Sequence, residues 1–189
     1  MSAFLLSCYL GAALVAQEPL ESGTDRMDSS SYATAPIRPP FEQKAIVIKS
    51  NQEKFDVLRG LQLPIDQYAI TGSGPLGIRN LKAIGDIDII VTPKLWTTLA
   101  ERYGITDEHG VRKIILLEGI VEAFGDGSFY HASIDPQAPT VASRIKNAEI
   151  IDGLPFDSIE NVLYYKRKDA REKDLKDILL IEEWMRQKS

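Results

Sequence analysis

The sequence predicts an α/β (α+β) domain in which a small mixed β-sheet is backed by helices and a helical pair closes the chain. Three observations support this class. Hydrophobic residues make up 44% of the 189 residues, which is enough to bury a sizeable core. Segments with the two-residue period of strands alternate with segments that have the helical period. Residues 157–188 hold two amphipathic helical patterns in succession.

The first forty residues are predicted to lie outside the folded domain, which is expected to span residues 41–189. They open with an apolar run, MSAFLLSCYLGAALVAQ, that lacks the positive charge and small-x-small site of a signal peptide and is short for a bilayer span. Residues 17–40 are rich in Ser, Pro, Thr and Asp, a composition typical of a disordered linker. We therefore expect a cytoplasmic protein without a membrane partner, and export on the apolar run is the minor alternative.

The first half of the domain shows four elements in order. A serine start signal and spaced apolar residues predict a helix at residues 50–61. Residues 67–73 read as a short strand that runs into a glycine turn. A helix is expected at residues 75–82, because proline suits a first helical turn. Residues 86–92 alternate and are β-branched, which predicts a strand.

The second half continues the alternation. Residues 93–104 have a proline at the start and a glycine at the end, as in a short helix. Residues 111–125 indicate two strands joined at a glycine. Residues 140–151 are expected to be helical, wholly or in part. Residues 157–170 and 171–188 are the two amphipathic helices that end the chain.

Two aspartates interrupt the strand predicted at residues 86–92. Asp86 and Asp88 share one face, because side chains two residues apart on a strand point the same way, while Ile87 and Ile89 turn towards the core. Aspartate is disfavoured in strands, and two neighbouring carboxylates repel each other. A divalent cation would offset this cost, and Mg²⁺ prefers carboxylate, water and phosphate oxygens. The pair therefore predicts a metal site that also grips phosphate.

A glycine turn precedes the aspartates by one short predicted helix. Gly72 and Gly74 allow the backbone to approach a ligand closely, and Ser73 adds a hydroxyl. The helix predicted after the turn would offer unpaired N–H groups to a phosphate. The sequence thus predicts a phosphate-binding turn and a metal pair in one cleft.

These motifs resemble the nucleotidyltransferase signature of the DNA polymerase β superfamily. In this chain Gly72-Ser73 is followed, after twelve residues, by Asp86-Ile87-Asp88. Residues 66–187 are similar to minimal nucleotidyltransferase-like proteins, and the segment after residue 165 is similar to the abortive-infection antitoxin type. The resemblance implies the nucleotidyltransferase fold and Mg²⁺-dependent transfer of a nucleoside monophosphate from a nucleoside triphosphate. The acceptor stays open between a protein hydroxyl, an RNA end and a small molecule.

The resemblance also implies roles for individual residues. Two Mg²⁺ ions would be held by Asp86, Asp88 and a third carboxylate, for which Glu122 is preferred and Asp135 is the alternative. The same third residue would accept the proton of the acceptor. The residues implied for nucleotide binding are Gly72, Ser73, Arg79, Lys166 and Lys173, with Lys166 ahead of Arg79 for neutralising charge and Asp174 orienting the lysine or its helix.

Composition bears on the possible partners and on disulfide bonds. The net charge of −5 and pI near 5.1 argue mildly against a nonspecific nucleic-acid binder and lower the case for an RNA acceptor, so nucleic acid stays open as a partner. The single cysteine, Cys8, excludes an intrachain disulfide. We assign no role to His109 or His131, and we expect Lys82 to be solvated. The alternative function is a catalytically inactive module or antitoxin that acts through a toxin-like protein partner.

Overall fold

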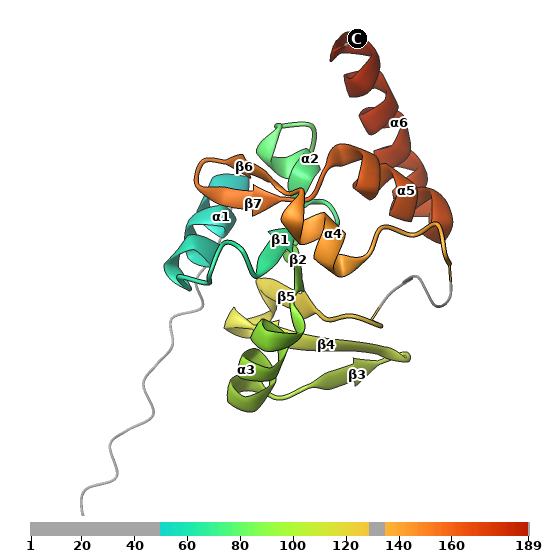
Figure 1. Cartoon of the computed structure of the whole chain (residues 1–189). Coiled ribbons are helices and arrows are strands. Elements are labelled where there is room, and N and C mark those ends of the chain that lie inside the picture. Colours follow the sequence, from blue (N-terminus) through green and yellow to red (C-terminus); the bar gives the residue numbers. More distant parts are fainter. Residues whose placement is uncertain (1–49, 129–134, 189) are drawn as a thin grey trace, which may run out of the picture. The chain divides into compact units, whose positions relative to one another are not determined.

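The computed structural model describes residues 50–128 and 135–188, so the predicted extension at residues 1–40 and His131 lie outside the described residues. The helices are α1 (Asn51–Gly60), α2 (Gly74–Ile78), α3 (Pro93–Tyr103), α4 (Val141–Lys146), α5 (Ile159–Asp169) and α6 (Glu172–Lys188), with a 3-10 turn η1 (Leu117–Gly119). The strands are β1 (Tyr68–Ile70), β2 (Ile87–Val91), β3 (Thr106–Glu108), β4 (Val111–Leu116), β5 (Val121–Phe124), β6 (Glu149–Ile151) and β7 (Leu154–Phe156). Figure 1 shows their arrangement.

The strands form one mixed sheet of seven in the order β3-β4-β5-β2-β1-β7-β6. Strand β2 lies at the centre, parallel to β5 and antiparallel to β1. The β1–β7 pair is parallel, whereas the β3–β4, β4–β5 and β6–β7 pairs are antiparallel. The prediction of a mixed sheet with helices and a C-terminal helical pair is therefore confirmed.

The sheet is wider than the sequence indicates. Strands β3, β6 and β7 have three residues each, which is too short for a two-residue period to stand out. The expected helical segment at residues 140–151 is helical only through Lys146, and its last three residues form β6. Similarly, α2 ends at Ile78 and is shorter than the predicted helix at residues 75–82.

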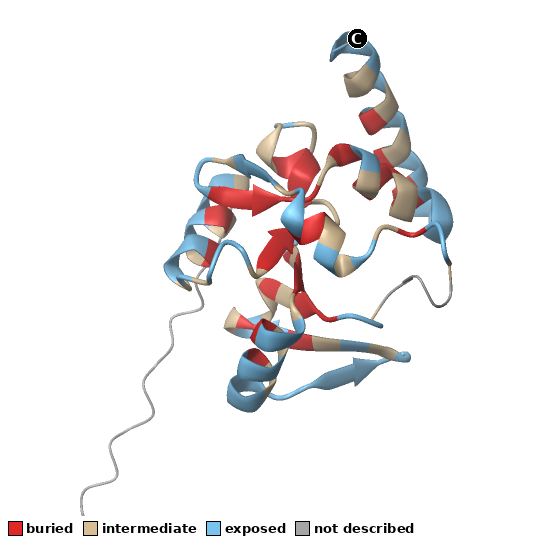
Figure 2. Ribbon diagram, in the orientation of Figure 1, coloured by how far each residue is buried: buried red, intermediate tan, exposed pale blue. Residues whose placement is uncertain are grey.

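The main core lies on the face of the sheet that carries Ile87, Ile89 and Val91, all fully buried. Helices α1 and α3 cover this face, for example through Phe55 and Leu95. The start of α1 follows from its sequence, because a serine–glutamate capping box closes its first turn. Figure 2 shows that the central strands are almost entirely buried.

The opposite face of the sheet is covered only in part. Ala69 and Ile90 pack there against Ile145 of α4. Helices α5 and α6 pack on each other and on Leu76 of α2, with Ile181 at the centre of that cluster. Within the described ranges, no helix is both long and apolar enough to cross a membrane. The uncovered part of this face, beside the N-terminal end of β2, is where the predicted site residues gather.

Candidate metal and phosphate site

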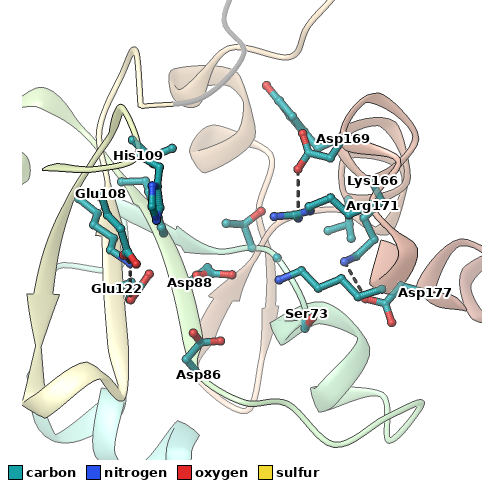
Figure 3. Close-up of a pocket in the computed structure, with 18 of the residues that line it drawn as sticks. Ser73, Asp86, Asp88, Glu108, His109, Glu122, Lys166, Asp169, Arg171 and Asp177 are labelled. Carbon is teal, nitrogen blue, oxygen red and sulfur yellow. Dashed lines mark hydrogen bonds and ion pairs between the residues drawn. The ribbon is translucent and has the colours of Figure 1, made fainter. Parts of the chain in front are cut away.

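Three carboxylates meet at one end of β2 and β5 (Figure 3). Asp88 lies directly opposite Glu122 in the parallel pairing of these strands, and Asp86 precedes β2 by one residue. Each of the three offers a carboxylate oxygen, and these atoms all lie within 4.8 Å of one another. Asp86 is exposed and the other two are half-buried. The shared face predicted for Asp86 and Asp88 is confirmed, and Glu122, not Asp135, is the third acid beside them.

The ionised form of Asp88 is disfavoured in this arrangement. Burial raises its pKa from 3.8 to about 7, and the charges of Asp86 and Glu122 add to the rise. Lys173 and Lys166 act in the opposite direction. Asp88 is therefore only partly ionised at neutral pH unless a cation approaches it.

The glycine turn lies against the carboxylate of Asp88. Gly72 has a φ of +58°, and a Cβ built on it would lie 2.1 Å from the Oδ2 atom of Asp88. The Thr71 N–H donates a hydrogen bond of 2.8 Å to the backbone carbonyl of Asp88, which ties the turn to β2. Glycine suits this position, because any other residue would strain the left-handed backbone and would displace the carboxylate of Asp88.

The same turn leaves polar groups without partners. The backbone N–H groups of Gly72 and Ser73 donate no hydrogen bond to any residue that the structure describes. The Ser73 hydroxyl likewise makes no capping hydrogen bond to α2. Backbone N–H groups that converge in a turn bind anions such as phosphate. With only five residues in α2, the turn itself is the better basis for anion binding than the helix dipole.

A cavity of about 510 Å³ opens above the triad and the turn. Its opposite wall comes from the end of α5, which contributes Lys166, and from the link between α5 and α6, which contributes Arg171 (Figure 3). Lys173 at the start of α6 also lines the cavity. Lys173 is exposed and makes no ion pair among the described residues. The cavity thus has the acidic triad on the sheet and a basic wall of Lys166, Arg171 and Lys173 on the helical pair, where Asp169 and Asp177 also line it. The basic groups of this wall are complementary to a metal-bound polyphosphate.

Lys166 is held in place by buried acids of α6. Its Nζ atom lies 3.2 Å from Asp174 Oδ1 and 2.7 Å from Asp177 Oδ2. Burial alone would raise the pKa of Asp174, but the hydrogen bond from Arg171 and the charge of Lys166 lower it overall. The expectation that Asp174 fixes the lysine agrees with this contact. Lys82 also pairs with Asp177, at 2.7 Å, so the expectation that Lys82 is simply solvated was wrong.

A second buried network contacts Thr71, the residue before the glycine turn. Arg144 of α4 is only 4% exposed and binds Asp157 Oδ2 through Nε at 2.8 Å and Nη2 at 2.6 Å. Its Nη2 also donates to the hydroxyl of Thr71, the residue before the turn. The ring of Tyr165 lies 4.3 Å from the guanidinium carbon. This network could not be predicted from the sequence, because its members are far apart along the chain and no motif joins them.

The β3–β4 hairpin forms the rim of the cavity on the acidic side. It brings Glu108, His109 and Lys113 to the cavity, so His109, to which we assigned no role, lines the site. Lys113 Nζ lies 2.8 Å from Glu122 Oε1 and 2.5 Å from Glu108 Oε2. These two hydrogen bonds raise the pKa of Lys113 above its usual range.

Two predicted residues lie away from the cavity. Arg79 bonds to the Pro75 carbonyl and to Glu149, and its guanidinium carbon lies 5.2 Å from the centre of the Trp184 ring. The structure therefore does not bring Arg79 to the triad. Asp135 accepts a hydrogen bond from the Tyr164 hydroxyl and pairs with Lys168, and it does not line the cavity.

The donor set of the triad suits a hard divalent cation. Three carboxylate oxygens within 4.8 Å of one another can close on one ion, since opposite ligands of Mg²⁺ are about 4 Å apart. The half-buried, partly protonated Asp88 is the group that gains most from a cation. Asp86, Asp88 and Glu122 are therefore the residues that could hold a metal.

Comparisons with known proteins do not extend this result. No protein-family model matches the sequence, and neither curated proteins nor solved structures match the chain. The findings thus establish a mixed α/β fold with an acidic triad that could bind a metal.

Proposed function

We propose that the protein is a Mg²⁺-dependent nucleotidyltransferase, which transfers a nucleoside monophosphate from a nucleoside triphosphate to an acceptor hydroxyl. The observation that carries the proposal is the acidic triad facing a basic wall across one cavity, with the glycine turn between them. A binding site for a metal-bound triphosphate needs these three parts. The nucleotidyltransferase fold and membership of that superfamily are part of the proposal.

The metal would be held by Asp86, Asp88 and Glu122, and it would supply charge neutralisation and alignment for the phosphate oxygens. The resemblance to the superfamily favours two ions. The unpaired N–H groups of Gly72 and Ser73 would bind the β- and γ-phosphates. Lys166 and Lys173 would neutralise the charge that develops on the leaving pyrophosphate, and Arg171 lies on the same wall.

The reaction balances with groups that the chain provides. The acceptor oxygen forms a bond to the α-phosphorus while the bond from that phosphorus to the β-phosphate bridging oxygen breaks. Pyrophosphate leaves towards the basic wall, and the acceptor proton passes to Glu122. Catalysis would come mainly from positioning and electrostatic stabilisation, as in phosphoryl transfer generally.

A second function is a catalytically inactive module that acts through a protein partner. The observation that favours it is that two groups with catalytic roles are already engaged. Glu122 pairs with Lys113, and Lys166 pairs with two buried aspartates. Such a protein would copurify with a partner and would turn over no nucleotide.

Labelling separates the two functions. The protein is incubated with cell lysate and with ATP, GTP, CTP or UTP labelled at the α-phosphate, with and without Mg²⁺. We expect a labelled product only with Mg²⁺, and none from Asp86→Asn or Asp88→Asn. Asp66→Asn is the matched control, because Asp66 is exposed and does not line the cavity. Labelling that persists in both site variants would refute the proposed site.

A further inference from the structure

We propose that Lys113 is a positioning residue that holds Glu122 back from the divalent ion in the nucleotide-free protein. The resting cavity would then bind metal through Asp86 and Asp88, and Glu122 would join only after Lys113 releases it. This inference rests on the proposed function and refines it. It also sets a limit on the expectation of two ions, which would apply only once nucleotide is bound.

The geometry of Lys113 carries the inference. Lys113 lies on β4, the neighbour of β5 on the side away from β2, and its Nζ atom lies 2.8 Å from Glu122 Oε1. The two side chains are only 13% and 17% exposed, so solvent screens their attraction much less than that of a surface pair. Asp86 and Asp88 have no ion pair of this kind among the described residues, so the ammonium selects one acid of the three.

The pairing makes Glu122 the weakest metal ligand of the triad. A carboxylate oxygen that accepts a charge-assisted hydrogen bond already has part of the electrostatic stabilisation that a metal ion would provide. Recruiting Glu122 to the ion would also bring the Lys113 ammonium close to a divalent cation, and these like charges repel each other. Asp86 and Asp88 bind the ion without this cost.

Glu108 is a second ionic partner for Lys113. Its Oε2 atom lies 2.5 Å from Lys113 Nζ, and its side chain is 54% exposed at the end of the β3–β4 hairpin. Lys113 can therefore leave Glu122 and keep an ionic partner. Glu108 and Lys113 both line the cavity, so a molecule that enters on this side can shift the balance between the two glutamates.

A double-mutant cycle measured by Mn²⁺ titration tests the inference without nucleotide and without turnover. Calorimetry is run on the full-length wild type, Glu122→Gln, Lys113→Met and the double variant. We expect Glu122→Gln to weaken Mn²⁺ binding less than about twofold in the wild type. Lys113→Met should tighten binding by about tenfold, and Glu122→Gln should remove most of that gain.

Two further variants separate this role from a general effect of charge. Lys173→Met removes a cation from the same cavity that does not touch Glu122, so its effect should add to that of Glu122→Gln. Lys113→Arg keeps the charge and the hydrogen bond and should bind Mn²⁺ like the wild type. Circular dichroism of each variant checks that it is folded.

The outcomes distinguish the inference from the proposed function. Equal effects of Glu122→Gln in the wild-type and Lys113→Met backgrounds would overturn the role of Lys113, while loss of binding in Asp88→Asn would still support the metal site. Wild-type protein that binds no Mn²⁺ would overturn both. A coupling of about tenfold between positions 113 and 122 supports the inference.

Discussion

Replacing Asp88 by Asn should make the metal-free protein more stable. Asparagine has nearly the same shape and carries no charge, so the variant removes the cost of burying a carboxylate beside Asp86 and Glu122. The structure gives the size of that cost. The rise in pKa of Asp88 from 3.8 to about 7 corresponds to about 4 kcal/mol at pH 8, as an upper limit.

The pH dependence follows from the sign of the shift. The folded protein binds the Asp88 proton more tightly than the unfolded chain does, so the stability of metal-free wild type falls as the pH rises from about 4 to about 7. The advantage of Asp88→Asn should therefore shrink to about 2 kcal/mol at pH 5. Saturating Mg²⁺ should reverse the order at pH 8, because only the wild type gains the full binding energy.

Urea denaturation in EDTA and in Mg²⁺, at pH 5 and pH 8, measures these differences. Asp66→Asn serves as the control and should change the free energy of unfolding by less than about 0.5 kcal/mol under all four conditions. An Asp88→Asn variant that is no more stable than the wild type at pH 8 in EDTA would contradict this burial cost. A stability difference that is the same at both pH values would contradict it as well.

Two other substitutions test the contacts that hold the site residues in place. Gly72→Ala should abolish Mn²⁺ binding, because its Cβ would displace the Asp88 carboxylate. Gly153→Ala is the control, because Gly153 also has a positive φ, +76°, but open space around it, so it should cost only about 1 kcal/mol of backbone strain. Equal effects of the two variants on Mn²⁺ binding would contradict the close contact between Gly72 and Asp88. Asp177→Asn should lower the free energy of unfolding by about 3 kcal/mol, because two lysines lose a buried partner. Glu183→Gln is the control, because it breaks only an exposed ion pair with Arg186, and it should lower the free energy of unfolding by less than about 0.5 kcal/mol. Urea denaturation of both variants checks the difference.

Much of the site could be predicted because strand geometry is local. The alternation around Ile87 and Ile89 fixes which face of the strand is buried, and this places Asp86 and Asp88 together on the other face. The Gly72 turn could be predicted for a similar reason, since a glycine close to the end of a strand indicates a tight backbone turn. These inferences needed only neighbours in the sequence.

The remaining features depend on contacts between distant segments. The choice between Glu122 and Asp135 required the order of the strands, because only the parallel pairing of β2 and β5 puts Glu122 opposite Asp88. Arg79 was assigned to the phosphates, but it turns to Glu149, a residue of a strand too short to predict. Lys113 reaches Glu122 only because β4 pairs with β5.

Isothermal titration calorimetry of ATP and the other nucleoside triphosphates, with and without Mg²⁺, measures whether the cavity binds a metal-bound triphosphate. The cavity pairs an acidic wall with a basic one, so we expect a nucleoside triphosphate to bind only when the metal neutralises the triad. Asp88→Asn should remove the Mg²⁺-dependent binding. Binding that is equally tight in EDTA, or absent for every nucleoside triphosphate in Mg²⁺, would contradict the proposed metal-dependent triphosphate site.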